Sequence, residues 1–204
     1  MPILYAALAF AILTISAWSR SEPSIIAPVS AVPDFGMVFP ADYRDAFTLY
    51  LVVDRVDATV RHIYAHPDAV RAARDGDSLP DGAQFVIETW DASRDWLGNI
   101  RRDADGRFIT ADMHPNVHVM EKRDDWTTDQ LPSPIGVIDW NFGSFDARTL
   151  QPSDENRNDC LTCHDGGAFR RDFIFSQRLL NQYAQTDTTQ YLYCHLPRRG
   201  NCIR

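Results

Sequence analysis

The chain has 204 residues, 45% of them hydrophobic and 11% aromatic, so it can bury one sizeable core and we expect a single globular domain. Its formal net charge of -8 argues against nucleic acid as a partner, because phosphates would repel so acidic a protein. Lys122 is the only lysine, so arginine supplies the other permanently cationic side chains.

An apolar run from Ile3 to Trp18 begins the chain and predicts contact with a membrane. Two interpretations of residues 1–21 stay open. As a signal peptide, the segment has an apolar core and small residues suited to cleavage. As an N-terminal membrane anchor, the run is slightly shorter than the roughly 20 residues that a spanning helix needs. Both interpretations predict a periplasmic protein, tethered to the inner membrane by this helix or secreted after cleavage.

Residues 22–38 are rich in Pro, Ser and Val without periodicity, which predicts a linker, and the domain is expected over residues 39–204. Helical spacing or helix boundary signals mark three segments, and strand patterns mark four. The predicted helices cover residues 42–51, 67–74 and 169–183, with Gly76 ending the second. The predicted strands cover residues 59–65, 83–91, 117–123 and 137–145. The polar segment between Ser93 and Pro115 predicts an extended hairpin.

The sequence Cys160-Leu161-Thr162-Cys163-His164 is a Cys-x-x-Cys-His pentapeptide, the attachment site of c-type haem. Two thiols at this spacing reach the two vinyl groups of one porphyrin, and the adjacent imidazole becomes the proximal ligand of the iron. The motif therefore predicts one covalently attached haem c, held by Cys160 and Cys163, with His164 as the metal ligand.

The spacing and context of the four cysteines disfavour two other uses. A zinc site would combine Cys160 and Cys163 with Cys194 and Cys202, but the second pair is spaced too widely for the usual zinc knuckle. A thioredoxin-like dithiol needs a strand-to-helix context, whereas residues 156–159 predict a loop before the motif. Because export permits disulfides, we expect Cys194 and Cys202 to pair with each other.

Further segments stand in the same order as in the cytochrome P-460 family, which includes the c′-beta cytochromes, and the chain resembles that family from Phe39 to Phe175. The segments that carry the resemblance, besides the late haem motif, are Phe39-Pro40 with Tyr43, Val60-Arg61-His62-Ile63-Tyr64, Leu79-Pro80-Asp81-Gly82 before the strand Phe85 to Glu88, His118-Val119-Met120-Glu121-Lys122, Asp139-Trp140-Asn141-Phe142-Gly143 and Asp172-Phe173-Ile174-Phe175.

The resemblance implies an α+β fold with a mainly antiparallel β-sheet and flanking helices, in a single c-type haem domain that usually forms a homodimer. It also implies a five-coordinate iron on His164 with an open distal face for a small nitrogen ligand, nitric oxide or hydroxylamine. All four methionines precede the motif. We interpret Met120 as a core residue of a strand.

Members of the family that oxidise hydroxylamine carry a lysine cross-linked to the porphyrin edge, near the end of the strand that corresponds to residues 83–91. Ser93 and Arg94 occupy this region here, and an arginine is a poor nucleophile because it stays protonated. Lys122 lies in another predicted strand and is interpreted as a surface or structural lysine. Whether the chain is an enzyme is therefore left open.

Two residues are candidates for catalysis. The resemblance implies a distal carboxylate that moves protons, for which Glu121 is the first candidate and Glu88 the alternative. Arg61 is the second catalytic candidate, since its guanidinium can donate to a bound ligand or to a haem propionate. Aromatic candidates for capping the distal face are Phe35, Phe47 and Phe85.

Two functions from different classes remain. The first is a periplasmic monohaem cytochrome of the P-460 type that binds or transforms small nitrogen ligands. The alternative is a non-enzymatic electron-transfer or structural haem subunit, anchored by the N-terminal segment to a larger membrane complex, with a redox protein as its partner.

Overall fold

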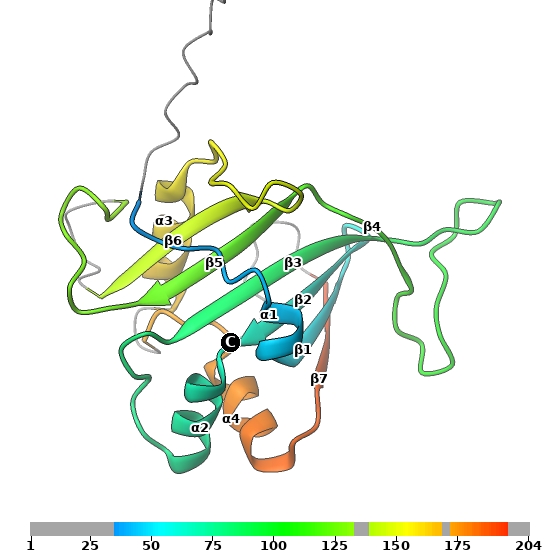
Figure 1. Ribbon diagram of the computed structural model, residues 1–204. Helices are drawn as coiled ribbons and strands as arrows, with labels where there is room; N and C mark the ends of the chain where they lie inside the picture. Colours follow the sequence, from blue (N-terminus) through cyan, green and yellow to red (C-terminus); the bar gives the residue numbers. More distant parts are fainter. Residues whose placement is uncertain (1–34, 133–138, 169–171, 196–204) are drawn as a thin grey trace, which may run out of the picture. The chain divides into compact units, whose positions relative to one another are not determined.

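The structure is a computed structural model that describes residues 35–132, 139–168 and 172–195, all within one compact unit, Val32–Arg204. A seven-stranded sheet forms its centre, with the order β6-β5-β3-β2-β1-β7 and with β4 paired to β3 outside this path (Figure 1). All pairs are antiparallel except β1 with β7. The strands are β1 (Thr48–Arg55), β2 (Thr59–Ala65), β3 (Gln84–Ala92), β4 (Thr110–Met113), β5 (Asn116–Lys122), β6 (Trp140–Asp146) and β7 (Gln190–Cys194). The predicted α+β class is confirmed.

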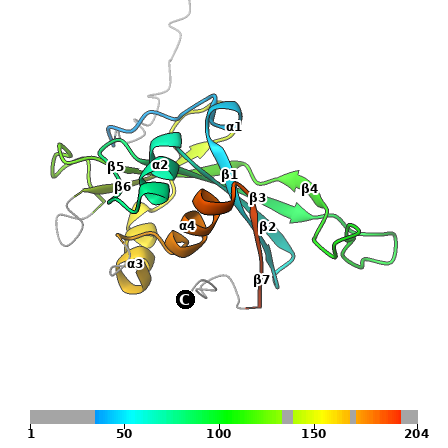
Figure 2. The ribbon, with the colours of Figure 1, turned by 90° about the horizontal axis from the view of Figure 1, so that it is seen from below.

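Helices cover the sheet on both faces. Figure 2 shows α3 (Arg157–Ala168) and α4 (Gln177–Thr186) on one side of the sheet and α1 (Tyr43–Ala46) on the other. On the α3 and α4 side, α2 (Pro67–Asp75) packs against α4 and shares one hydrophobic core with the sheet. A second core, under α1 and the segment that leads to it, lies on the opposite face.

Strand β3 shows how one sequence serves both cores. Side chains alternate between the two faces of a strand. Phe85 accordingly belongs to the core under α2 and α4, whereas Val86 belongs to the core under α1. Both are almost completely buried, and apolar area removed from water stabilises the fold by about 25 cal/mol per Å². The central position of β3 therefore joins the two cores into one folding unit.

The helix predicted over residues 67–74 is confirmed, together with its boundary signals. Pro67 stands at the first helical positions, where its missing N–H costs no hydrogen bond, and the His66 side chain accepts from the Asp68 N–H. Gly76 ends the helix in the left-handed conformation, with φ of 78°, which glycine adopts without a steric penalty.

The helix predicted over residues 42–51 is wrong beyond its first turn. Helix α1 has four residues, and Tyr50 and Leu51 belong to β1. The register of β1 against β2 shifts between Leu49 and Leu51, which is a β-bulge. The bulge lets Tyr50 and Leu51 both enter the same core, so their adjacent burial imitates a helical face.

The helix predicted over residues 169–183 begins later. Residues 169–171 lie outside the described part of the chain, and Asp172 and Phe173 have φ of 50° and 60°. Such left-handed residues cannot continue a right-handed helix, so α4 begins only after Ser176. The loop predicted at residues 156–159 is also wrong in part, because α3 begins at Arg157.

The four predicted strands match β2, β3, β5 and β6, although residues 137 and 138, the first two of the last predicted strand, lie outside the described chain. Strand β7 was not predicted. Its cysteine, Cys194, is fully buried and disulfide-bonded, while its expected partner Cys202 lies outside the described residues. The predicted N-terminal segment and most of the linker also lie outside them. Among the described residues, no helix has the length and apolarity needed to cross a membrane.

The predicted hairpin excursion forms an arm that contains the same turn twice (Figure 1). In each turn an aspartate, Asp95 or Asp103, accepts hydrogen bonds from the N–H groups two and four residues later, all at 2.9 Å. The preceding arginine, Arg94 or Arg102, donates to the carbonyl four residues later at 2.7 Å. Trp96 at the first tip is 90% exposed.

Candidate functional site

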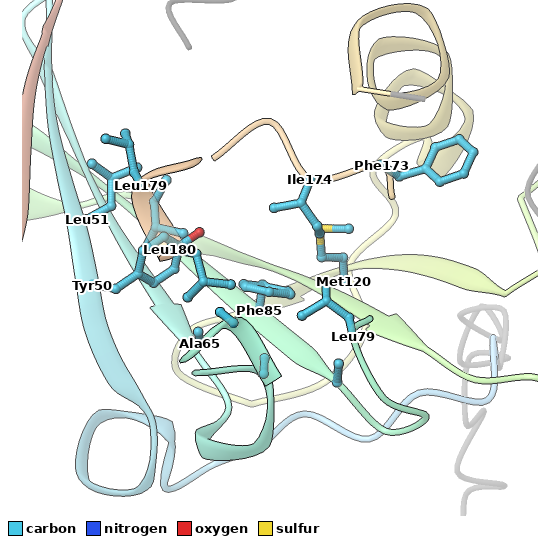
Figure 3. Close-up of a cluster of buried hydrophobic side chains, with 14 of the residues drawn as sticks. Tyr50, Leu51, Ala65, Leu79, Phe85, Met120, Phe173, Ile174, Leu179 and Leu180 are labelled. Atoms are coloured by element: carbon cyan, nitrogen blue, oxygen red, sulfur yellow. The ribbon is translucent and has the colours of Figure 1, made fainter. Parts of the chain in front are cut away.

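A cavity of about 280 Å³ lies between the sheet and α3. Its sheet wall carries apolar side chains of β2, β3 and β5, among them Ile63, Phe85 and Met120. Ile174, on the segment before α4, contributes from the other side. Figure 3 shows Phe85, Met120 and Ile174 directed toward one another, within the core that continues from this wall. Such a mostly apolar cavity with a few polar groups is the usual form of a cofactor site.

Helix α3 directs the three motif side chains toward this cavity. Residues three and four positions apart share one face of a helix, so Cys160 lies above Cys163 and His164. All three line the cavity, and both cysteines are free thiols. Burial raises the pKa of the Cys160 thiol to about 11, so this group is a neutral thiol at pH 7. The whole motif is helical, and its three functional side chains line one cavity.

His164 is held in one orientation. Its Nδ1 lies 2.6 Å from the Phe173 carbonyl oxygen, which can only accept, so Nδ1 carries the proton and Nε2 keeps its lone pair for a metal. Phe142 and Phe175 flank the imidazole, each with its ring centre 4.9 Å away. Burial lowers the pKa of His164, which favours the neutral, metal-binding form. This arrangement fits an axial ligand of haem iron.

The turn that supplies the Phe173 carbonyl is itself anchored to the sheet. Asp172 accepts from Lys122 Nζ at 2.8 Å and from the Trp140 indole at 3.1 Å. Lys122 also lies 3.4 Å from Asp139. The single lysine is thus a structural residue, as predicted, and it does not line the cavity of the described chain.

Two arginines add positive charge to the cavity wall. Arg55 at the end of β1 and Arg61 on β2 both line the cavity. Arg55 Nη2 and Arg61 Nε are buried without a hydrogen-bond partner. Unpartnered buried donors are costly, so these atoms fit a bound group that carries acceptors. Haem is such a group, since it has two propionate carboxylates besides its apolar ring.

The structure therefore brings Arg61 together with Cys160, Cys163 and His164, but it does not bring Glu121 to them. Met120 faces the cavity, and because side chains alternate along β5, Glu121 faces the other way. Glu121 is 8% exposed, and burial raises its pKa. The sequence predicts that Met120 and Glu121 point to opposite faces of β5, but only the structure shows which of the two faces the cavity.

The alternative carboxylate, Glu88, also lies on the far face. It is fully buried and accepts hydrogen bonds from the Tyr43 hydroxyl at 2.5 Å, from Arg44 Nε at 2.5 Å and from the Trp90 indole at 2.8 Å. Burial alone would raise the pKa of Glu88, but the hydrogen bonds, that from His62 foremost, lower it to about 2. This carboxylate is therefore already satisfied by the fold.

Sequence reasoning missed several cavity residues. Arg55 follows Asp54 at the end of the apolar run of β1, and two buried charged residues in one strand were a usable signal. His118 lines the cavity and pairs with Glu155 at 2.7 Å, which lowers the pKa of Glu155 to about 2. Phe142 and Phe175 carry no signal of their own, because an aromatic residue in a strand or loop most often packs in a core.

The comparisons with known proteins agree with this site. One family model, described as Cytochrome P460, matches residues 40–176, a range that includes the cavity wall, the motif and the Phe173 turn. Comparison with curated proteins gives no match. A cytochrome family implies haem binding, for which the free thiols, the oriented imidazole and the unpartnered arginines are suited. The chain belongs to the cytochrome P460 family.

Proposed function

We propose that this protein is a periplasmic c-type cytochrome that carries one covalently attached haem and binds small nitrogen ligands, nitric oxide or hydroxylamine. The observation that carries the proposal is the meeting of Cys160, Cys163 and His164 at one apolar cavity, with His164 Nδ1 bonded to the Phe173 carbonyl at 2.6 Å. Haem supplies an iron that exchanges electrons with a small ligand.

The residues of the chain have separate roles in this proposal. Cys160 and Cys163 would hold the porphyrin through thioether bonds, and the lone pair of His164 Nε2 would bind the iron. Ile63, Phe85 and their neighbours keep water from the sheet side of the cavity. Exclusion of water strengthens every electrostatic interaction within the site.

Arg61 is the proposed hydrogen-bond donor within the cavity, because its Nε is buried there without a partner. The proposed proton relay through Glu121 has no support from its placement, since the carboxylate faces away from the cavity. A lysine cross-link has none either, because Lys122 makes ion pairs with Asp172 and Asp139. We therefore propose ligand binding in preference to hydroxylamine oxidation.

The test uses the full chain, expressed in a bacterial host with c-type haem maturation. Intact mass and the pyridine haemochrome spectrum are expected to show one ordinary haem c, and the ferrous form is expected to bind nitric oxide. The Cys160→Ala and Cys163→Ala double variant should lose the covalently bound haem. Thr162→Ala, an exposed residue between the two, should keep it. A colourless wild-type protein would refute the proposal.

One observation favours the alternative function, a haem subunit of a larger membrane complex. Trp96 and Leu97, 90% and 64% exposed, form an apolar tip on the arm, and exposed apolar groups of this kind mark contacts with other proteins. Under this alternative the ferrous protein does not bind nitric oxide, and detergent-extracted wild type, but not Trp96→Ala, elutes with a partner. The same material, subjected to N-terminal sequencing and light scattering, tests the proposed membrane anchor and homodimer.

A further inference from the structure

Two cationic side chains share the wall of the cavity with little compensating charge. Arg55 is 4% exposed and forms one salt bridge, in which its Nε lies 3.6 Å from Asp57 Oδ2, a distance longer than a normal hydrogen bond. Its Nη1 lies 3.9 Å from the sulfur of Cys194, a weak acceptor. Its Nη2 has no partner, and neither has the buried Nε of Arg61 on the adjacent strand.

Burying these two groups together is unfavourable by itself. Each guanidinium loses its hydration, and the two like charges repel each other across the cavity wall. Burial first, and Arg55 second, lower the pKa of Arg61. Asp57 is the acidic neighbour, but its Oδ1 already accepts from the Thr59 hydroxyl at 2.6 Å. A buried pair of cations is stable only when anions with suitable acceptors lie beside it.

The geometry of a guanidinium indicates which anion this is. Its planar fork of N–H groups matches a carboxylate or a similar small oxyanion, which can accept two parallel hydrogen bonds. The free donors, Arg55 Nη2 and Arg61 Nε, belong to side chains that line the same cavity as Cys163 and His164. An anion in this position would neutralise both arginines inside the haem cavity.

We propose that Arg55 and Arg61 form a carboxylate-binding site in the cavity wall, and that the propionates of the haem occupy it. A small free oxyanion that enters the cavity is the second source of the same chemistry. The first source rests on the proposed function, because it requires haem in the cavity, whereas the second does not. Nothing in the Cys-x-x-Cys-His motif determines where the propionates go, so this assignment adds Arg55 to the haem site and gives the Arg61 donor a defined partner.

The variants for the test are Arg55→Gln and Arg61→Gln, with Arg55→Lys and Arg61→Lys keeping the charge. Arg101→Gln, an exposed residue of the arm, removes the same charge elsewhere. Every sample is first checked for haem by its pyridine haemochrome spectrum. A wild type without haem contradicts the proposed function while leaving the free-anion source to be tested by the second measurement. If one glutamine variant does not load haem, the other carries the comparison.

The first measurement is the reduction potential of the holoprotein between pH 5 and 8. If the propionates occupy the site, wild type shows a potential nearly independent of pH. Each glutamine variant then shows a potential that falls as pH rises, because an unpartnered propionate takes up a proton when the iron is reduced. The shift across this range is expected to reach about tenfold in the reduction equilibrium, or about 59 mV for one electron. Arg101→Gln and the lysine variants should remain close to wild type.

The second measurement is calorimetric titration of the same proteins with formate, the smallest carboxylate, with any bound haem kept ferrous so that formate does not bind the iron. A free-oxyanion site predicts saturable binding by wild type, at least about tenfold weaker in the glutamine variants and largely kept in the lysine variants. Occupation by propionates predicts no formate binding by wild type. If the glutamine variants match Arg101→Gln in both measurements, the proposed site does not exist.

Discussion

Lys122 Nζ lies 2.8 Å from Asp172 Oδ2, and this ion pair joins the last residue of β5 to the turn that orients His164. Asp172 and Phe173 both have positive φ, a conformation that costs a non-glycine residue of order 1 kcal/mol each. The contacts from Lys122 and Trp140 hold the turn in this conformation. The only lysine of the chain thus acts on the haem site indirectly, as a positioning residue.

Replacing Lys122 with Met should loosen this turn. We expect a loss of about 1.5–3 kcal/mol in the free energy of unfolding, because a hydrogen-bonded charge pair is broken and Asp172 is left without its cation. The reduction potential should rise, since a weaker bond from His164 Nδ1 makes the imidazole a poorer electron donor. Lys122→Arg should restore both values. Urea titration and potentiometry measure them, and an unchanged potential in Lys122→Met would contradict the positioning role.

Met120 provides a test of the open haem face. Its thioether lies in the cavity wall, so a sixth bond to iron is the outcome that must be distinguished from core packing. Met120→Leu conserves volume and should cost less than about 1.5 kcal/mol in unfolding free energy. The ferrous absorption spectrum and the affinity for nitric oxide should stay unchanged, as in the matched variant Met113→Leu. A change in coordination seen only in Met120→Leu would show that this methionine binds the iron.

The buried Glu88 carboxylate should make the protein sensitive to acid. Its pKa is about 2 in the folded protein, against 4.5 for an ordinary glutamate side chain, so the folded state favours the ionised form. The corresponding stability, about 3 kcal/mol, is complete above pH 4.5 and is lost as pH falls toward 2.

Denaturation curves between pH 2 and 7 measure this effect. Glu88→Gln should be less stable than wild type at pH 7 and should show a flatter dependence on pH below 4.5. Glu155→Gln should have a smaller effect, because that carboxylate is 43% exposed and solvent screens it. Equal slopes for Glu88→Gln and wild type would contradict the prediction.

The two turns of the arm predict that the exposed tip contributes less to stability than the aspartates that accept the hydrogen bonds of the turns. Trp96→Ala should change the free energy of unfolding by less than about 0.5 kcal/mol, because the side chain is exposed and the second turn forms without an aromatic residue. Asp95→Ala and Asp103→Ala should each lower the free energy of unfolding more than Trp96→Ala does, since two backbone N–H groups lose their acceptor. Urea denaturation measures all three. A larger loss in Trp96→Ala than in Asp95→Ala would mean that the tip packs against the domain.

Several features of this protein could be predicted from local sequence patterns. The Cys-x-x-Cys-His motif identifies the two thiols and the imidazole of the site, and Pro67 and Gly76 mark the ends of α2. Both signals are local, because covalent spacing and backbone conformation depend on neighbouring residues. Strands β2, β3 and β5 were also predicted, since β-branched and aromatic residues are concentrated in them. The α+β class and the family followed from the order of these segments.

Tertiary contacts decided the rest. The spacing of Tyr50 and Leu51 predicted a helix, whereas a bulge in β1 places both side chains in one core. Glu121 was predicted at the cavity, whereas the orientation of β5 directs it away. Arg55 meets Arg61 only because β1 pairs with β2, and Lys122 reaches Asp172 across 50 residues of chain. Such relationships depend on register and on loop conformation. These are set by the packing of distant segments, which no local pattern contains.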